Sequence, residues 1–164
     1  MPDIIADFHG TLYEDPNEGP LWKFVAKRAV TPLPVALVVH PVRTVAFAMA
    51  KPKLQELVER YGRGEIVYDK IYEAFNHRVL PHLSMHFVEG AILSYSRLPE
   101  TKRKLDRRML KAIGDSEGQK GILSTGSMDF ILDVLPYGWS LSPDNIVANP
   151  VVRIGEGSRF ALLV

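Results

Sequence analysis

Apolar residues follow two different periods along this chain, and short continuous apolar runs mark its two ends. Residues 3–7 form such a run, which ends on Asp7, and residues 121–127 and 145–149 form two more. Runs of this length with polar ends predict buried strands of a parallel sheet. Residues 151–164 have turn-forming glycines between two apolar segments and predict a hairpin.

Between these ends, from residue 21 to residue 113, apolar positions recur with the helical period. Apolar residues at i, i+3, i+4 and i+7 form one face of a helix. Residues 53–61 carry one such stripe, which consists of Leu54, Leu57, Val58 and Tyr61. Residues 69–80 carry a second, which consists of Ile71, Phe75 and Val79. Residues 101–113 predict a single basic helix whose apolar face consists of Leu105, Met109 and Ile113.

The two patterns together predict an α/β fold, in which a Rossmann-like core with a parallel sheet is interrupted by an α-helical cap. The core is expected to comprise residues 1–18 and 116–164, and the cap residues 19–115. Residues 10–20 are rich in Pro and Gly and predict a hinge between the two parts.

Composition and charge are those of an ordinary globular chain of 164 residues, with 46% hydrophobic residues and a net charge of +1. Such a small net charge gives no reason to expect a nucleic-acid partner. The chain has no cysteine, which excludes disulfides, thiolate nucleophiles and cysteine zinc sites. Asp3 and Asp7 stand where a signal peptide would have a basic segment, so we expect a cytoplasmic protein.

The longest apolar stretch covers residues 32–50 and is interrupted by polar residues and by Pro32, Pro34 and Pro41. Proline breaks a continuous spanning helix, so we expect no stable membrane insertion. Two explanations of its apolar character stay open. The stretch is either helix or loop packing that is buried, or a surface that contacts lipid or a lipid-like substrate.

The chemistry of the strand ends suggests a site for phosphate. A carboxylate such as Asp7 can attack a phosphoryl group and form an acyl-phosphate, which splits one difficult step into two. Gly10 and Thr11 follow it as a turn with backbone N–H groups nearby. Thr125 supplies a hydroxyl donor, and Gly126 lets the chain approach closely. The alternative is that Asp7 is a capping or turn residue and Thr125 a turn hydroxyl.

The stretches IIADFHGTL (residues 4–12) and GILSTGS (residues 121–127) resemble the first two motifs of the haloacid dehalogenase-like superfamily. The helical insertion between them resembles the cap of its phosphoserine-phosphatase-like branch. The resemblance implies a hydrolase of a small phosphomonoester that works through an aspartyl-phosphate on Asp7. It also implies Mg²⁺ bound by Asp7 and by the main-chain carbonyl of His9. The residues that it implies for the phosphate are Gly10, Thr11, Thr125 and Gly126.

His9 stands where the family has a second aspartate, which protonates the leaving group and then activates water. Imidazole can do general acid–base work, so His9 is the expected acid/base. A neighbouring metal ion favours its neutral form, however, and neutral imidazole is a poor leaving-group acid. The function is therefore a phosphohydrolase that is impaired, with two alternatives. One is an inactive protein of this fold that binds a ligand or self-associates, and the other a metal-independent hydrolase of dehalogenase type.

The residues after Thr125 lack the acidic motif that completes the magnesium site in the family. Asp129 and Asp133 fall on a predicted helix, and Asp144 precedes a strand, so none of the three is well placed. Without later strands, the first strand lies at a sheet edge, which is a pairing liability. We therefore expect a fragment, a degenerate relative, or half of a homo-oligomer that covers this edge.

Overall fold

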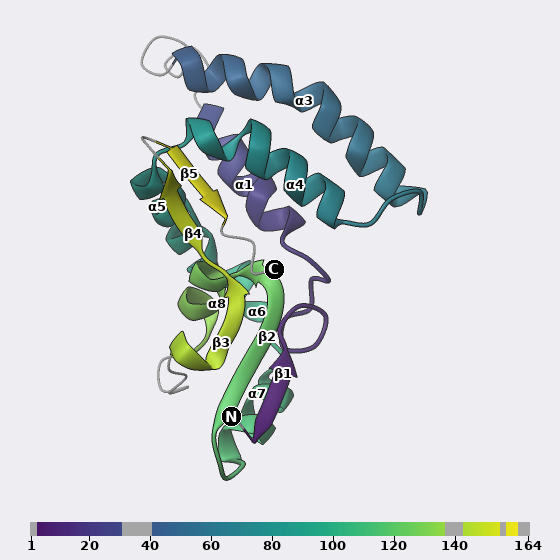
Figure 1. Cartoon of the computed structure of the whole chain (residues 1–164). Helices are drawn as coiled ribbons and strands as arrows, with labels where there is room; N and C mark the ends of the chain where they lie inside the picture. Colours follow the sequence, from purple (N-terminus) through teal and green to yellow (C-terminus); the bar gives the residue numbers. More distant parts are fainter. Residues whose placement is uncertain (1–2, 31–40, 137–142, 155–156, 161–164) are drawn as a thin grey trace. The chain divides into compact units, whose positions relative to one another are not determined.

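A computed structural model describes residues 3–30, 41–136, 143–154 and 157–160, with side chains for 3–29, 41–136 and 144–150 (Figure 1). The chain forms two compact units. The sheet unit contains the described residues of Met1–Leu21 and Ile92–Val151, and the helical unit those of Trp22–Ala91 and Val152–Phe160. The predicted division into 1–18 with 116–164 and 19–115 separates the chain differently at residues 92–115, and it stays a prediction.

Three parallel strands form the sheet of the sheet unit, as the apolar runs predict. They are β1 (Ile4–Asp7), β2 (Lys120–Ser127) and β3 (Ile146–Asn149), in the order β1-β2-β3. Asp7 pairs with Leu123, and Leu123 pairs with Val147. The class is therefore mixed α/β, and β1 lies at an edge of the described sheet.

The two faces of this sheet differ in burial, so the prediction of buried strands is only half right. On one face Ala6, Ile122 and Ile146 are buried. On the other, Ile5, Leu123 and Val147 have exposed fractions of 58%, 54% and 51%. Helix α8 (Met128–Val134) packs on β2 and β3 and buries Phe130 and Ile131. Right-handed crossovers between parallel strands bring successive helices to the same face, which leaves the other face open.

The strand β2 continues directly into α8, where the sequence predicts a tight turn. Residues Thr125, Gly126 and Ser127 belong to the strand, and Ser127 is the N-cap of the helix. The Ser127 hydroxyl accepts a hydrogen bond from the backbone N–H of Phe130 at 3.4 Å. A serine N-cap satisfies a donor of the first helical turn, so the chain passes from strand to helix without a loop.

The single helix predicted for residues 101–113 is wrong, because two short helices occupy this stretch. They are α6 (Pro99–Arg103) and α7 (Arg107–Asp115). Asp106 begins the second helix, and its carboxylate accepts hydrogen bonds from the backbone N–H groups of Arg108 and Met109. The new helix buries Leu110 and leaves Met109 41% exposed, so the predicted apolar face is wrong at Met109, whereas Leu105 is buried as predicted.

The helical unit is built from α3 (Pro41–Gly62), α4 (Asp69–Arg78) and the 3₁₀ helix η1 (Leu80–His82). Helix α3 packs against α4, and both contact η1. Helices α1 (Gly19–Val30) and α5 (Met85–Ser96) each begin in one unit and end in the other. The strands β4 (Val151–Ile154) and β5 (Gly157–Phe160) form a two-stranded sheet, as predicted, and the turn between them lies outside the described residues.

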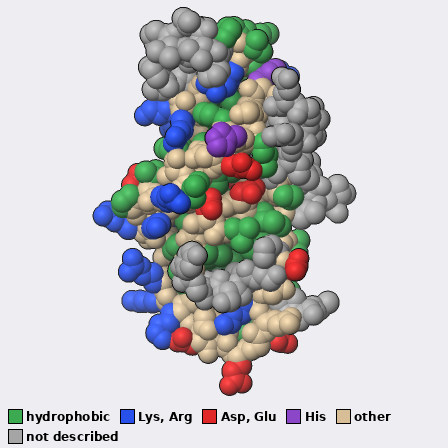
Figure 2. Space-filling view, turned by 90° about the vertical axis from the view of Figure 1, so that its left-hand side faces the viewer, with side chains coloured by type: hydrophobic (Ala, Val, Ile, Leu, Met, Phe, Trp, Pro, Cys, Tyr) green, Lys and Arg blue, Asp and Glu red, His purple; other side chains and the backbone are tan. Residues whose placement is uncertain are grey.

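The apolar stripes of the helical unit are buried to different degrees. In α4 and its C-cap, Phe75 and Val79 are buried, as the helical period predicts. In the second half of α3 only Leu57 is buried, whereas Val58 is 54% and Tyr61 39% exposed. Figure 2 likewise shows hydrophobic side chains at the surface between charged ones.

The apolar stretch 32–50 lies partly outside the described residues, and its residues 41–50 form the start of α3. Their inner side is buried through Thr44, Phe47 and Ala50. Their outer side is exposed. The interpretation as buried packing therefore holds for the inner side of residues 41–50 and is wrong for the outer side. No helix of the described residues is long and apolar enough to cross a membrane.

Candidate functional site

Asp7 and Thr125 are exposed at the carboxyl ends of two neighbouring parallel strands. Asp7 is the last residue of β1 and pairs with Leu123, two residues before Thr125 on β2. Leu123 and Thr125 are both exposed, as is Asp7. The carboxyl edge of an open α/β sheet is where such folds bind ligands. The structure thus brings a carboxylate and a hydroxyl to one edge of the sheet.

The residues after Asp7 form a compact loop that its own backbone closes. Gly10 has a φ of 77°, in the left-handed region that favours glycine. Its N–H donates to the carbonyls of Tyr13 at 2.7 Å and Asp15 at 3.2 Å, and Thr11 is exposed beside it. The Gly10 N–H, which the resemblance assigns to phosphate, therefore serves the loop in this conformation.

The backbone N–H of Gly126 also makes a hydrogen bond within the chain. Its N–H donates to the Ser124 hydroxyl at 3.0 Å. At the neighbouring position, the Asn149 side-chain amide donates to the Thr125 carbonyl at 2.6 Å and joins the ends of β2 and β3. The Thr125 side chain remains the exposed polar group at the end of β2.

His9 does not lie at the surface with Asp7. Its side chain is 7% exposed and lies among aromatic rings, with centroids 5.0 Å from Phe8, 5.9 Å from Tyr13 and 6.4 Å from Phe130. In this conformation His9 is part of the core under the loop.

A buried carboxylate, Glu18, faces His9. Glu18 Oε1 lies 3.7 Å from His9 Nε2, its side chain is 1% exposed, and it accepts a hydrogen bond from the backbone N–H of Ser127. His9 Nδ1 lies 3.3 Å from the carbonyl oxygen of Asp15 and can only donate to it. His9 Nε2 faces the Glu18 carboxylate, and it has no hydrogen-bond partner among the described residues.

Gly126 is the floor of this buried cluster. A β-carbon there would lie 2.6 Å from His9 Nε2 and 2.9 Å from Glu18 Oε1. The side chains of His9 and Glu18 thus rest directly on the end of β2, where only a hydrogen fits. The absence of a side chain at Gly126 leaves room for those of His9 and Glu18, and its role in phosphate binding stays a prediction.

Glu18 has no sequence signal that marks it as part of this cluster. It lies in a turn-rich segment next to Asn17, whose side chain accepts from the Gly19 N–H at 2.9 Å at the start of α1. An acidic residue in such a segment is an ordinary feature of a loop. Its burial follows from a contact with Ser127, more than a hundred residues away.

Two further polar groups stabilise the same loop. Lys104 Nζ donates to both carboxylate oxygens of Asp15, at 2.9 and 2.7 Å, and this hydrogen bond raises the pKa of Lys104. Tyr13 is buried, and burial together with the nearby Tyr95 phenol raises the pKa of Tyr13 far above its usual range. Both groups lie in the core or at its margin rather than at the exposed edge.

The described residues contain no group of three or more His, Asp or Glu side chains arranged to hold a metal ion. At the sheet edge Asp7 offers one exposed carboxylate, and the main-chain carbonyl of His9 is a ligand only by the family resemblance. Magnesium binds through one or two carboxylates plus substrate phosphates and water. The donor set therefore fits Mg²⁺ only as an ion that is held jointly with a bound phosphate.

Comparison of this chain with family models, with curated proteins and with solved structures finds no match.

Proposed function

We propose that this chain hydrolyses small phosphomonoesters with Asp7 as the nucleophile, in the manner of the haloacid dehalogenase-like superfamily. The observation that carries the proposal is the exposure of Asp7 and Thr125 at the carboxyl ends of adjacent parallel strands. In this proposal the sheet unit is the Rossmann-like core and the helical unit is the cap.

The reaction has two steps. A carboxylate oxygen of Asp7 attacks phosphorus, and the bond from phosphorus to the alcohol oxygen breaks, which leaves an acyl-phosphate on Asp7 and an alkoxide that takes up a proton. Water then attacks phosphorus, the bond from phosphorus to the Asp7 oxygen breaks, and inorganic phosphate is released. The Thr125 hydroxyl donates to a phosphoryl oxygen and orients it. Mg²⁺ held by Asp7 and the His9 carbonyl would neutralise phosphate charge.

Burial of His9 has a consequence for substrate choice. The imidazole is 7% exposed and faces Glu18, so the geometry supports it as a positioning residue that supports the loop after Asp7. The leaving oxygen then takes its proton from solvent. Esters whose leaving group is stable as an anion, such as aryl phosphates, are therefore expected to react much faster than alkyl phosphates.

The test measures phosphate release from nitrophenyl phosphate, phenyl phosphate and an alkyl phosphate, with and without Mg²⁺. We expect turnover to fall steeply along this series. Asp7→Asn should lower it by about 10³-fold or more, because the nucleophile is lost. Glu14→Gln, which changes another exposed carboxylate of the same N-terminal segment, is the matched control. Equal rates in the Asp7→Asn variant and the wild type would overturn the proposal.

A second candidate is a non-catalytic protein of this fold that binds a ligand or self-associates. The observation in its favour is that the position of the family's acid/base holds a side chain packed between Phe130 and Glu18. The edge strand β1, with Ile5 58% exposed, is the surface expected to pair with another copy. Absence of turnover with every ester, together with a solution mass of two chains that Ile5→Lys returns to one, would favour this candidate.

A further inference from the structure

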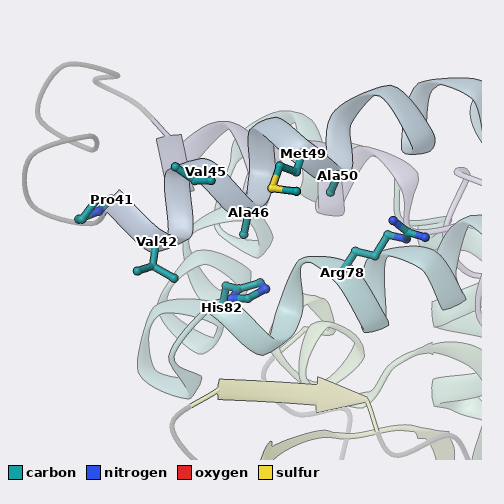
Figure 3. Close-up of a pocket in the computed structure, with 8 residues that line it drawn as sticks. All are labelled: Pro41, Val42, Val45, Ala46, Met49, Ala50, Arg78 and His82. Carbon is teal, nitrogen blue, oxygen red and sulfur yellow. The ribbon is translucent and has the colours of Figure 1, made fainter.

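The helical unit contains an apolar groove that the proposed phosphatase chemistry does not use. It lies between the first half of α3 and the end of α4 with η1, and its volume is about 600 Å³ (Figure 3). One wall is formed by Val42, Val45, Ala46 and Met49 of α3, and Arg78 and His82 lie on the other side. A volume of this size is typical of a small-molecule site.

The α3 wall is an apolar stripe that faces solvent. Val42, Val45 and Met49 have exposed fractions of 72%, 51% and 75%. Their spacing of three and four residues places them on one side of the helix, together with Ala46. A stripe of this kind normally packs against a core. Here it lines an open groove instead, and it belongs to the apolar stretch whose contact with a lipid-like molecule the sequence leaves open.

The opposite side of the groove supplies one positive charge, the guanidinium of Arg78. In Figure 3, His82 lies opposite Val42 and Ala46, and Arg78 lies further along, nearer Ala50. Both side chains are exposed. Among the described residues, neither Arg78 nor His82 takes part in an ion pair, whereas Lys53 and Arg60 of α3 do. The Arg78 guanidinium thus keeps its donors for a ligand oxygen.

We propose that this groove binds a single-chain amphiphilic carboxylate, a free fatty acid, with its hydrocarbon chain along α3 and its carboxylate at Arg78. The wall from Pro41 to Ala50 is about 14 Å long at the rise of an α-helix, which suits a chain of medium length. Burial of the chain removes apolar surface of Val42, Val45 and Met49 from water, and the carboxylate complements the cationic side.

The test titrates the full-length protein with dodecanoate below its micelle concentration, by calorimetry. Dodecyltrimethylammonium, with the same chain and the opposite charge, should bind about tenfold or more weakly. Val45→Glu and Met49→Glu each place a carboxylate in the apolar wall and should weaken dodecanoate binding by about tenfold or more. Arg78→Gln should weaken it by about three- to fivefold, as expected for an exposed charge pair.

The matched control is Val58→Glu, which introduces the same charge at another exposed apolar position of α3, outside the groove. It should bind dodecanoate like the wild type, and circular dichroism should show that all variants are folded. Equal loss of binding in the control would overturn the proposal. Equal affinity for dodecanoate and dodecyltrimethylammonium would also overturn it. So would capture by anionic vesicles without binding of free dodecanoate, or a dimer that Val45→Glu dissociates. None of these results depends on Asp7, so a failure here leaves the hydrolase proposal untouched.

Discussion

Two neighbouring regions of the sheet unit contain residues from the same short segment, and they differ in how far these side chains are exposed to solvent. At the exposed carboxyl edge, Asp7 and Thr125 meet solvent. Immediately beneath the loop, His9 and Glu18 are buried against Gly126 with almost no exposed surface. One residue, Phe8, separates Asp7, the proposed nucleophile, from His9, and the fold places the Asp7 side chain outside the core and that of His9 inside it. The edge is therefore suited to chemistry and the buried cluster to stability.

The largest expected effect is on stability, at the floor of the buried cluster. Gly126→Ala places a methyl group 2.6 Å from His9 Nε2, so the cluster must move or open. We expect it to lower the free energy of unfolding by about 3 kcal/mol, measured by urea denaturation. The matched control is Gly90→Ala in α5, where a β-carbon meets nothing within 4 Å. That change should be neutral or stabilising, because alanine favours helix. Similar losses in both variants would show that the cluster is not tightly packed.

The next effect concerns the charge of the cluster. Glu18→Gln keeps the size of the side chain and an acceptor for the Ser127 N–H, but removes the carboxylate that faces His9. We expect a loss of about 1 kcal/mol, because the charged acceptor of the Ser127 N–H becomes a neutral one, and a hydrogen bond to a charged group is about twice as strong. Glu14→Gln, at an exposed position of the same segment, should change stability by less than about 0.5 kcal/mol. A neutral outcome for Glu18→Gln would mean that the charge of Glu18 does not stabilise the cluster.

Alkaline pH tests the buried side of this comparison, where the Tyr13 ring packs against His9. The pKa of Tyr13 is raised, chiefly by burial, so the folded state keeps the phenol neutral where the unfolded chain ionises. Its contribution to stability is complete below pH about 10 and declines as the pH rises further, by about 1.4 kcal/mol per pH unit for one proton. Tyr13→Phe should remove this decline in urea titrations at successive pH values. Tyr61→Phe, at a 39% exposed phenol, should leave it unchanged, and the reverse pattern would contradict the assignment.

The strands and the exposed edge could be predicted from sequence because they depend on local patterns. Apolar runs that end in polar residues define β1, β2 and β3, and strand ends meet at one edge of a parallel sheet. Burial of His9 depends instead on Glu18 and on Gly126, more than a hundred residues further along the chain, which no local pattern links to it. Asp106 has the chemistry of an N-cap, so the sequence allows a new helix to begin there. The basic residues on both sides of Asp106 favour the interpretation as one continuous helix instead.

The smallest expected effect on stability belongs to the residues that matter most for the proposed reaction. Asp7 and Thr125 are exposed, and the Thr125 carbonyl, rather than its side chain, accepts the Asn149 hydrogen bond. Asp7→Asn and Thr125→Val should therefore change the free energy of unfolding by less than about 0.5 kcal/mol while they lower turnover. Urea denaturation and phosphate release, measured on the same preparations, test both halves of this statement. A large loss of stability in either variant would mean that the edge is structural, and the contrast with the buried cluster would then disappear. Unchanged stability with lost turnover would indicate that these side chains act on a bound substrate rather than on the fold.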